Sequence, residues 1–388
     1  MKVDKTKWNI FPIKDIAIIL NGYAFKSEKY CSDGIRIIRI TNVQDGFIED
    51  NDPKFYSFSI ENELQRFILH EGDLLISLTG NVGRVGILND SFLPAALNQR
   101  VGCIRPTKKA CVKFLYYQLR KESFKKDCIR SAKGVAQLNM STEWLKEYKL
   151  FVPSLSEQQS IATELDSIQT MIDGYKAQLT DLDALAQSIF LDTFGKPSEW
   201  NNSKLIDVCN KITDGTHNPP QFTEEGIPFI FVSNIINNEI TYNTQKFINE
   251  ETYNELWKST PVECGDIVYT SVGSYGNPAI VKSKKKFMFQ RHIALIKPKH
   301  DIINSQYLKW FLISPLGRQQ ADDRSIGVAQ KTLNLKVIKN FDVPIPPLPL
   351  QQQFAEHVEA IEKQKDLLRE QLKDAETLMA ERMQYYFS

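Results

Sequence analysis

The chain has 388 residues, of which 42% are apolar, so it is long enough for about two domains with sizeable hydrophobic cores. Its 48 lysines and arginines nearly balance its 47 aspartates and glutamates, which leaves a formal charge of +1. This balance excludes a strongly basic protein that holds nucleic acid by its total charge, but it can conceal a basic face opposite an acidic one.

The first residues and the cysteines indicate a cytoplasmic protein. The segment Met1–Asn9 is charged and lacks the apolar core of a signal peptide, and the apolar run Ile16–Leu20 is too short to span a bilayer. The six cysteines form no CxxC pair and the five histidines form no HxxxH pair, so the spacing predicts reduced thiols and no metal site. We therefore expect a soluble protein without a membrane segment, a metal or a cofactor.

The two halves of the chain repeat the same motifs in the same order. Trp8 is matched by Trp200, and Asn42 by Asn234, at an offset of 192 residues. The other matched motifs have offsets of 191 to 193 residues: Gly72-Asp73 with Gly265-Asp266, Gly80 and Gly83 with Gly273 and Gly276, Gln99-Arg100 with Gln290-Arg291, and Gly134–Gln137 with Gly327–Gln330. A nearly constant offset with slips of one residue is typical of an internal duplication.

Each copy begins with short β-rich segments and continues into helix. In the first copy we expect strands at Ile35–Ile40, Leu74–Leu78 and Val101–Ile104, separated by turn clusters of Gly, Asn and Asp. Some helix is expected at Val112–Cys128 and, in the second copy, at Gln306–Ser314. The sequence therefore predicts an α+β fold.

Proline-containing linkers close the globular part of each copy at Val152-Pro153 and at Val343–Pro347. Proline disfavours a helix before it and is tolerated at a helix start, so each linker is expected to lead into a helix. The predicted order is a β-rich domain at residues 1–152, a long helix at 153–196, a second β-rich domain at 197–345 and a second long helix at 346–388.

Both helical segments carry a heptad pattern in a shared register. The positions expected to form the core of a helix pair are Ile161, Leu165, Ile168, Ile172, Leu179, Leu182, Phe354, Val358, Ile361, Leu368, Leu372 and Met379, and Lys365 and Arg382 interrupt the second series. A solvated coiled-coil dimer stalk is one interpretation. An antiparallel pair within one chain is the other, and it predicts a rigid spacer with pseudo-twofold symmetry, which suits duplex DNA with two half-sites.

This duplicated order resembles the specificity subunit of type I restriction–modification systems, over essentially the whole chain. The segment Pro153–Gln158 resembles the P-x-L-x-E-Q helix entry of that family, whereas the second copy has Leu350 where glutamate is usual. The segments Ile212–His217 and Leu20–Phe25 resemble two common starts of its recognition domains, and Gly72-Asp73 followed by Gly80 is also typical. Each motif is weak by itself, and their duplicated order is specific.

The resemblance implies a role in DNA recognition without chemistry of its own. Each of the two target-recognition domains would read one half of a bipartite site on double-stranded DNA. The helices would set the spacing between the halves and dock two methyltransferase subunits, and restriction–translocase subunits would join that complex.

Three other interpretations stay open at this stage. A catalytic methyltransferase is disfavoured, because Asn218–Gln221 has Gln221 where the Asn-Pro-Pro-aromatic motif needs an aromatic residue and no glycine-rich cofactor loop precedes it. We find no compact nuclease constellation and no P-loop around Gly80–Gly86. A structural coiled-coil adaptor, or an orphan specificity-like protein without enzymatic partners, is the remaining class.

Candidate DNA contacts are loop residues that can bind base edges or phosphates. In the first copy they are Arg39, Asn42, Thr79, Asn81, Arg84, Gln99, Arg100 and Lys133; in the second they are Thr216, His217, Asn218, Ser233, Asn234, Ser274, Tyr275, Asn277, Gln290, Arg291, Arg324 and Gln330. If the copies read different sequences, residues that recur in both are better suited to backbone contacts or structure. Residues that differ, such as Arg84 against Asn277, are the better candidates for base readout.

Overall fold

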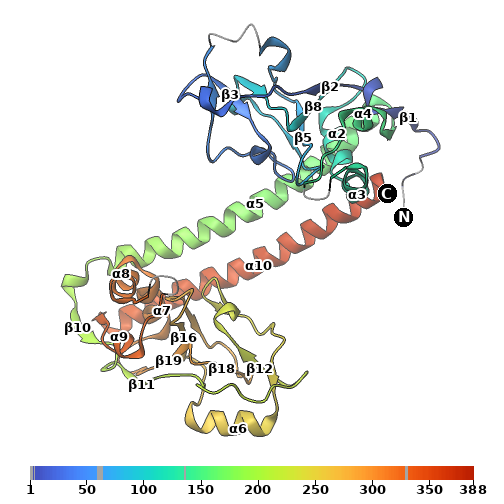
Figure 1. Cartoon of the computed structure of the whole chain (residues 1–388). Coiled ribbons are helices and arrows are strands. Elements are labelled where there is room, and N and C mark those ends of the chain that lie inside the picture. Colours follow the sequence, from blue (N-terminus) through green and yellow to red (C-terminus); the bar gives the residue numbers. More distant parts are fainter. Residues whose placement is uncertain (1–2, 4, 59–63, 135–136, 328–330) are drawn as a thin grey trace. The chain divides into compact units, whose positions relative to one another are not determined.

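The computed structural model describes all residues except 1–2, 4, 59–63, 135–136 and 328–330 (Figure 1). The chain forms two compact units, of which one contains Met1–Lys176 and Glu370–Ser388 and the other contains Ala177–Arg369. Each unit therefore includes one globular domain and a part of each long helix. Within the described part of the chain, no helix is long and apolar enough to cross a membrane.

The first unit is built on a four-stranded antiparallel sheet in the order β2-β8-β5-β6. These strands are β2 (Ala17–Asn21), β8 (Val101–Pro106), β5 (Leu74–Ser77) and β6 (Val85–Ile87). In a second sheet, β3 (Ile35–Ile38) is antiparallel to β4 (Phe55–Tyr56) and parallel to β7 (Ala95–Leu97). The ribbon of β1 (Asn9–Pro12) and β9 (Lys149–Val152) joins the start of the domain to the linker before the long helix.

The second unit repeats this topology strand for strand. Its four-stranded sheet has the order β11-β19-β16-β17, with β11 (Cys209–Asp214), β19 (Ile293–Pro298), β16 (Ile267–Thr270) and β17 (Pro278–Ile280). In its second sheet, β12 (Ile227–Ile230) is antiparallel to β15 (Phe247–Ile248) and parallel to β18 (Met288–Phe289). The closing ribbon pairs β10 (Asn201–Lys204) with β20 (Asp342–Ile345), and the hairpin β13 (Ile235–Ile236) to β14 (Glu239–Ile240) and helix α6 (Glu250–Ser259) are its further elements. The predicted α+β class and the internal repeat are confirmed.

The segment Val112–Cys128 is helical, as expected. Its helix is divided into α2 (Val112–Leu119) and α3 (Glu122–Ser131). Lys121 adopts an extended backbone between them, so the chain turns and α3 buries Phe124 and Cys128 in the same core as α2. The helix expected at Gln306–Ser314 is α7 (Ser305–Ile313), and α4 (Thr142–Glu147), α8 (Pro315–Arg324) and α9 (Leu335–Lys339) complete the set.

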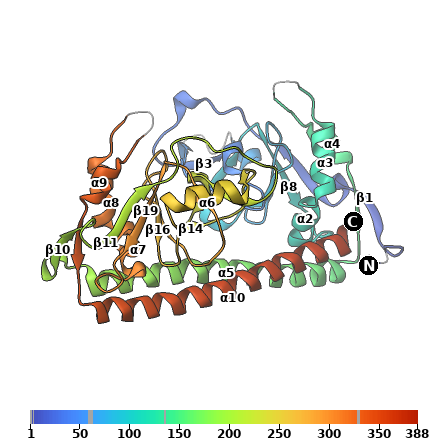
Figure 2. The ribbon, with the colours of Figure 1, turned by 90° about the horizontal axis from the view of Figure 1, so that it is seen from below.

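The two long helices are α5 (Leu155–Phe194) and α10 (Leu348–Phe387). In each unit, a segment of α5 lies antiparallel to a segment of α10 (Figure 2). In the first unit Ile168 and Ile172 pack against Ala375, and in the second Phe190 and Phe354 meet with ring centroids 5.5 Å apart. Of the positions expected in the helix-pair core, Ile161, Leu165, Ile168, Ile172, Phe354, Val358, Ile361 and Leu368 are buried, and Leu179, Leu182, Leu372 and Met379 are half-buried.

The two residues that interrupt the heptad pattern make ion pairs between the helices. Lys365 is buried, and its Nζ lies 2.6 Å from Asp183 Oδ1 of α5 and 2.9 Å from Glu362 Oε1 of its own helix. In the first unit, Arg382 Nε lies 2.9 Å from Glu164 Oε1. A buried cation at a core position stabilises less than an apolar side chain would, but it favours the one register in which its partners face it.

A buried glutamine fixes the start of each long helix. Gln158 Oε1 accepts a hydrogen bond from Cys111 N, and its Nε2 donates to Lys109 O and Pro153 O. Gln351, 193 residues later, makes the same three bonds with Asn304 N, Ile302 O and Pro346 O. These glutamines tie the first turn of α5 and α10 to the loop before α2 and α7, which explains the Gln of the helix-entry motif.

Leu350, which replaces the usual glutamate of the helix-entry motif, removes a hydrogen-bond acceptor in the second unit. In the first unit, Trp8 Nε1 donates to Glu157 Oε1 at 3.0 Å. The equivalent Trp200 Nε1 is buried without a hydrogen-bond partner among the described residues, because the residue at the position of Glu157 is Leu350, which cannot accept. An unpaired buried N–H costs about 1–3 kcal/mol.

The Gly-Asp motif of each copy supports the four-stranded sheet. Asp73 is buried and accepts hydrogen bonds from Nε and Nη2 of Arg105 on β8, both at 2.7 Å, and from His70 N. Asp266 accepts from Lys297 on β19 at 2.6 Å. The motif therefore holds the start of β5 and of β16 to the neighbouring strand, and it has a structural role in both units.

Candidate nucleic-acid interface

The turn between β5 and β6 presents polar side chains at the end of the central sheet. Gly80 and Gly83 adopt φ values of +69° and +84°, a region that residues with a Cβ rarely enter. Ser77 Oγ donates to Asn81 O and accepts from Arg84 N, which closes the turn. Asn81 is exposed and Arg84 is half-buried, so the turn displays both side chains.

This turn borders a groove of about 420 Å³ in the first unit. Three predicted DNA contacts line it, Thr79, Asn81 and Arg84, together with Thr41, Gln44 and Gln137. Arg84 Nη1 donates to Gln44 Oε1 at 2.9 Å, which holds the guanidinium over the groove and leaves its other donors available.

The groove has the chemistry that base recognition needs. A guanidinium can donate two parallel hydrogen bonds to guanine, and an amide can both donate to and accept from adenine. Arg84 supplies the first type of group, while Asn81 and Gln137 supply the second. The amide of Gln44 already bonds Arg84 and Thr41 O.

The remaining contacts predicted in the first unit lie elsewhere. Gln99, Arg100 and Lys133 are exposed and do not line the groove. Arg39 Nη2 donates to the backbone oxygen of Asp52 at 2.5 Å, so part of its guanidinium is already used within the loop.

Asn42 and Asn234 hold loops together and do not reach the surface. Asn42 is 3% exposed; its Oδ1 accepts from Arg39 N and its Nδ2 donates to Glu49 O and Asp50 Oδ1. Asn234 is 6% exposed and makes the equivalent bonds with Phe231 N and Asn243 O. The expectation that these two asparagines contact DNA is therefore corrected: both belong to the loop scaffold, in line with their recurrence.

The second unit carries a differently lined cavity. A space of about 360 Å³ brings the predicted contact Arg291 together with Ser271, His292 and Asn334. Partial burial, and then the charge of Arg291, lower the pKa of His292, so this imidazole is neutral at pH 7 and offers one donor and one acceptor.

The other contacts predicted in the second unit fall into two groups. The first group is exposed or half-buried: Ser233 lies in the short 3-10 helix Val232–Asn234, and the others lie in loops or turns, namely Thr216, His217, Asn218, Ser274, Asn277 and Gln290. Tyr275 is buried and donates to Asp322 Oδ1 at 2.6 Å, and Arg324 donates to Asn340 O and lies 3.3 Å from Asp342 Oδ2. Tyr275 is thus corrected to a structural residue, and Gln330 lies outside the described residues.

Sequence reasoning missed several of the residues that line these cavities, namely Thr41, Gln44, Gln137, His292 and Asn334. A usable signal exists for two of them: Gln44 lies two residues after the recurring Asn42, and His292 follows the recurring Gln290-Arg291. The described residues contain no group of three or more His, Cys, Asp and Glu side chains that could hold a metal ion.

Comparison with known proteins identifies the family. The family described as "Type I restriction modification DNA specificity domain" matches the chain twice, over residues 5–182 and 197–377. The chain therefore belongs to this family and is a specificity subunit of a type I restriction–modification system, as the sequence predicts.

Individual relatives span most of the chain or one copy. The EcoBI specificity subunit of Escherichia coli is 27% identical over 401 residues, which cover 95% of this chain and 82% of that protein. The MjaVIII specificity subunit of Methanocaldococcus jannaschii is 32% identical over 171 residues, which cover 43% of this chain and 40% of that protein.

Solved structures share the fold. The S subunit of a type I system from M. genitalium superposes with a TM-score of 0.61 at 17% identity, covering 100% of this chain and 98% of that one. A chain from a structure described as showing complex assembly and conformational transition of the type I R-M system has a TM-score of 0.56 at 15% identity, covering 97% of each chain.

Proposed function

We propose that this chain is the non-catalytic DNA-recognition subunit of its complex and that each copy reads one half of a bipartite target. The target-recognition domains are residues 1–152 and 197–345, and the helices are residues 153–196 and 346–388. The observation that carries the proposal is that the same scaffold presents different polar groups at matched positions in the two copies.

The divergence is concentrated at the groove of the first unit. Thr79, Asn81 and Arg84 line that groove, and the residues at their positions in the second copy are Val272, Ser274 and Asn277. The isolated bridges Thr79 to Asn139 and Val272 to Thr332 support this alignment. Two domains that share a backbone fold but carry different hydrogen-bonding side chains could read two different half-sites.

The long helices supply the other half of the proposal. They would set the distance between the half-sites and dock two methyltransferase subunits, with restriction–translocase subunits joining the complex. Exposed large apolar side chains support docking on these helices: they are Met171, Leu185 and Leu191 of α5 and Leu367 and Leu378 of α10.

The test uses the chain assembled with its methyltransferase subunit. The target is first read from the methylated motifs in the genome of a host that carries both proteins, and binding is then measured on variants of each half-site. Arg84→Ala should relax recognition at one or two positions of one half-site, each by about 1–3 kcal/mol. Arg130→Ala, on an exposed side chain of α3, is the control and should leave recognition unchanged.

Three results would count against the proposal. If Arg84→Ala weakens binding equally on every DNA sequence, Arg84 binds phosphate and does not read a base. Methylation or cleavage of DNA by the purified chain alone would show that the subunit is catalytic. Assembly that never changes binding to DNA would favour a structural adaptor.

A further inference from the structure

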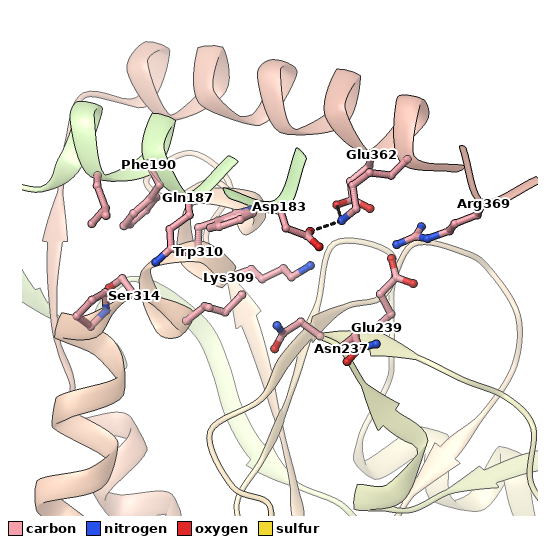
Figure 3. Close-up of a pocket in the computed structure, with 15 residues that line it drawn as sticks. Asp183, Gln187, Phe190, Asn237, Glu239, Lys309, Trp310, Ser314, Glu362 and Arg369 are labelled. Atoms are coloured by element: carbon pink, nitrogen blue, oxygen red, sulfur yellow. Dashed lines mark hydrogen bonds and ion pairs between the residues drawn. The ribbon is translucent and has the colours of Figure 1, made fainter. Parts of the chain in front are cut away.

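A second cavity, of about 380 Å³, lies within the second unit between the globular domain and the long helices (Figure 3). Its walls come from the turn between β13 and β14, from α7, and from the adjoining segments of α5 and α10. One wall is apolar and includes Phe190, Trp310 and Pro315; the other contains Lys309, Asn237 and Arg369. Its volume lies in the range of about 300–1,000 Å³ that is common for small-molecule sites.

Lys309 is the unmatched charge of this cavity. Its side chain points into the space between Asp183 and Asn237 (Figure 3), and the residue is only 9% exposed. Among the described residues it makes no hydrogen bond or ion pair, whereas Lys365 in the same cavity is paired with Asp183 and Glu362. Burying an ammonium group without a partner is costly, so an anion that entered the cavity would relieve that cost.

The other charges of the cavity are satisfied within the protein. Glu239 is paired with Lys282 at 3.2 Å, and Arg369 with Asp366 at 2.7 Å. Burial lowers the pKa of Lys309 to about 8, although Glu362 and Glu239 act in the opposite direction. The neighbouring carboxylates therefore do not compensate for the burial of this lysine. With a pKa of about 8, Lys309 is still largely protonated at pH 7.

The adjacent residue adds a second unsatisfied donor. Trp310 Nε1 is buried and has no hydrogen-bond partner among the described residues. Its indole ring stacks with the ring of Phe190, with centroids 6.4 Å apart and an interplanar angle of 27°. The cavity thus combines a cation with an aromatic wall.

The first copy shows that the fold does not need this cation. Tyr116 occupies the position of Lys309; its hydroxyl donates to Gly46 O at 2.7 Å and accepts from Arg120 Nη1 at 2.9 Å. Tyr117, at the position of Trp310, donates to Asp166 Oδ1 at 2.7 Å. Both positions are satisfied inside the first unit and left open in the second, so the open donors are a property of this cavity and not of the architecture.

We propose that this cavity is a binding site for a carboxylate carried on an apolar, preferably aromatic, body. Lys309 Nζ binds the carboxylate, and the wall of Phe190, Trp310 and Pro315 covers the apolar body. The carboxylate can belong to a free small acid or to an acidic side chain of a bound protein. The site is independent of the proposed DNA groove, which lies in the first unit.

Benzoate and its neutral isostere benzamide are the probes for the first test, by calorimetric titration of the full chain. We expect benzoate to bind at least about tenfold more tightly than benzamide, because only benzoate accepts a charge-assisted hydrogen bond. Lys309→Met should weaken benzoate about tenfold or more and leave benzamide unchanged. Lys258→Met, on an exposed residue of α6, is the matched control and should behave like the wild type.

The second test distinguishes the two sources of the carboxylate. Benzoate binding that persists when the chain is assembled with its methyltransferase subunit supports a free acid as the ligand. Loss of benzoate binding on assembly, together with weaker assembly of Lys309→Met, supports an acidic side chain of that subunit. The proposal is overturned if benzoate does not bind the wild-type chain. It is also overturned if benzoate and benzamide bind with equal affinity to the wild type and to Lys309→Met. Binding to DNA, measured in parallel, reports separately on the proposed function.

Discussion

Replacement of the buried lysine by methionine, Lys309→Met, should stabilise the free chain at neutral pH. Burial lowers the pKa of Lys309 from 10.5 to about 8, and one pKa unit corresponds to about 1.4 kcal/mol of differential stability. The charged side chain therefore lowers the free energy of unfolding by about 3 kcal/mol at pH 7. Methionine fills a similar volume without a charge, so the variant should recover most of that free energy.

The effect has a defined dependence on pH. Because the folded pKa of about 8 lies below the unfolded value of 10.5, the unfolded chain binds more protons between these values, and the free energy of unfolding rises with pH in that window. The destabilisation is complete below about pH 8 and is lost as the pH approaches 10.5. The charged groups that face Lys309 and influence its pKa are Lys282, Glu239, Glu362 and Lys365.

Urea unfolding of the wild type and of Lys309→Met at pH 7 and pH 10, followed by circular dichroism, measures this difference. We expect Lys309→Met to be more stable by about 3 kcal/mol at pH 7 and the gap to be much smaller at pH 10. Lys258→Met, on the exposed face of α6, controls for the loss of a charge at the surface. A gap that is equal at both pH values, or a methionine variant that is less stable at pH 7, would refute the reasoning.

Three further predictions concern contacts that the two copies share or have lost. Glu157→Leu should lower the stability of the first unit by about 1–2 kcal/mol, because the hydrogen bond to the indole of Trp8 is lost. Leu350→Glu should raise the stability of the second unit by about 1–2 kcal/mol, because the buried indole of Trp200 gains an acceptor. Hydrogen exchange at the two helix entries measures both effects, and changes of equal sign would contradict this prediction. Asp73→Ala should cost about 3–5 kcal/mol because Arg105 loses a buried partner, and a cost below about 1 kcal/mol in urea unfolding would mean that the pair behaves as a surface pair. Gln351→Leu should cost about 1–3 kcal/mol through unsatisfied backbone groups, and an unchanged melting temperature in calorimetry would exclude this.

Tertiary packing decided several features that local patterns predict poorly. The pattern over Val112–Cys128 is compatible with one helix, but the chain turns at Lys121 because two short helices bury Phe124 and Cys128 in a common core. Gln158 and Gln351 are polar residues at a helix start, where solvent exposure is the usual outcome, and they are buried because three backbone groups converge on each. Asn42 and Asn234 are withdrawn from the surface because each bonds two backbone groups of its loop.

The sequence by itself determined the duplication, the α+β class and the two long helices, because offsets and heptads are properties of residue order and need no knowledge of distant contacts. Only the tertiary structure decided which polar residues face solvent and which face one another. Arg84 and Gln44 come together, and Tyr275 is buried against Asp322, through contacts between segments 40 and 47 residues apart in the chain. The exposure of a side chain depends on what packs against it from such segments. Polar residue types therefore indicated candidate DNA contacts, and only the tertiary structure showed which of these candidates are exposed.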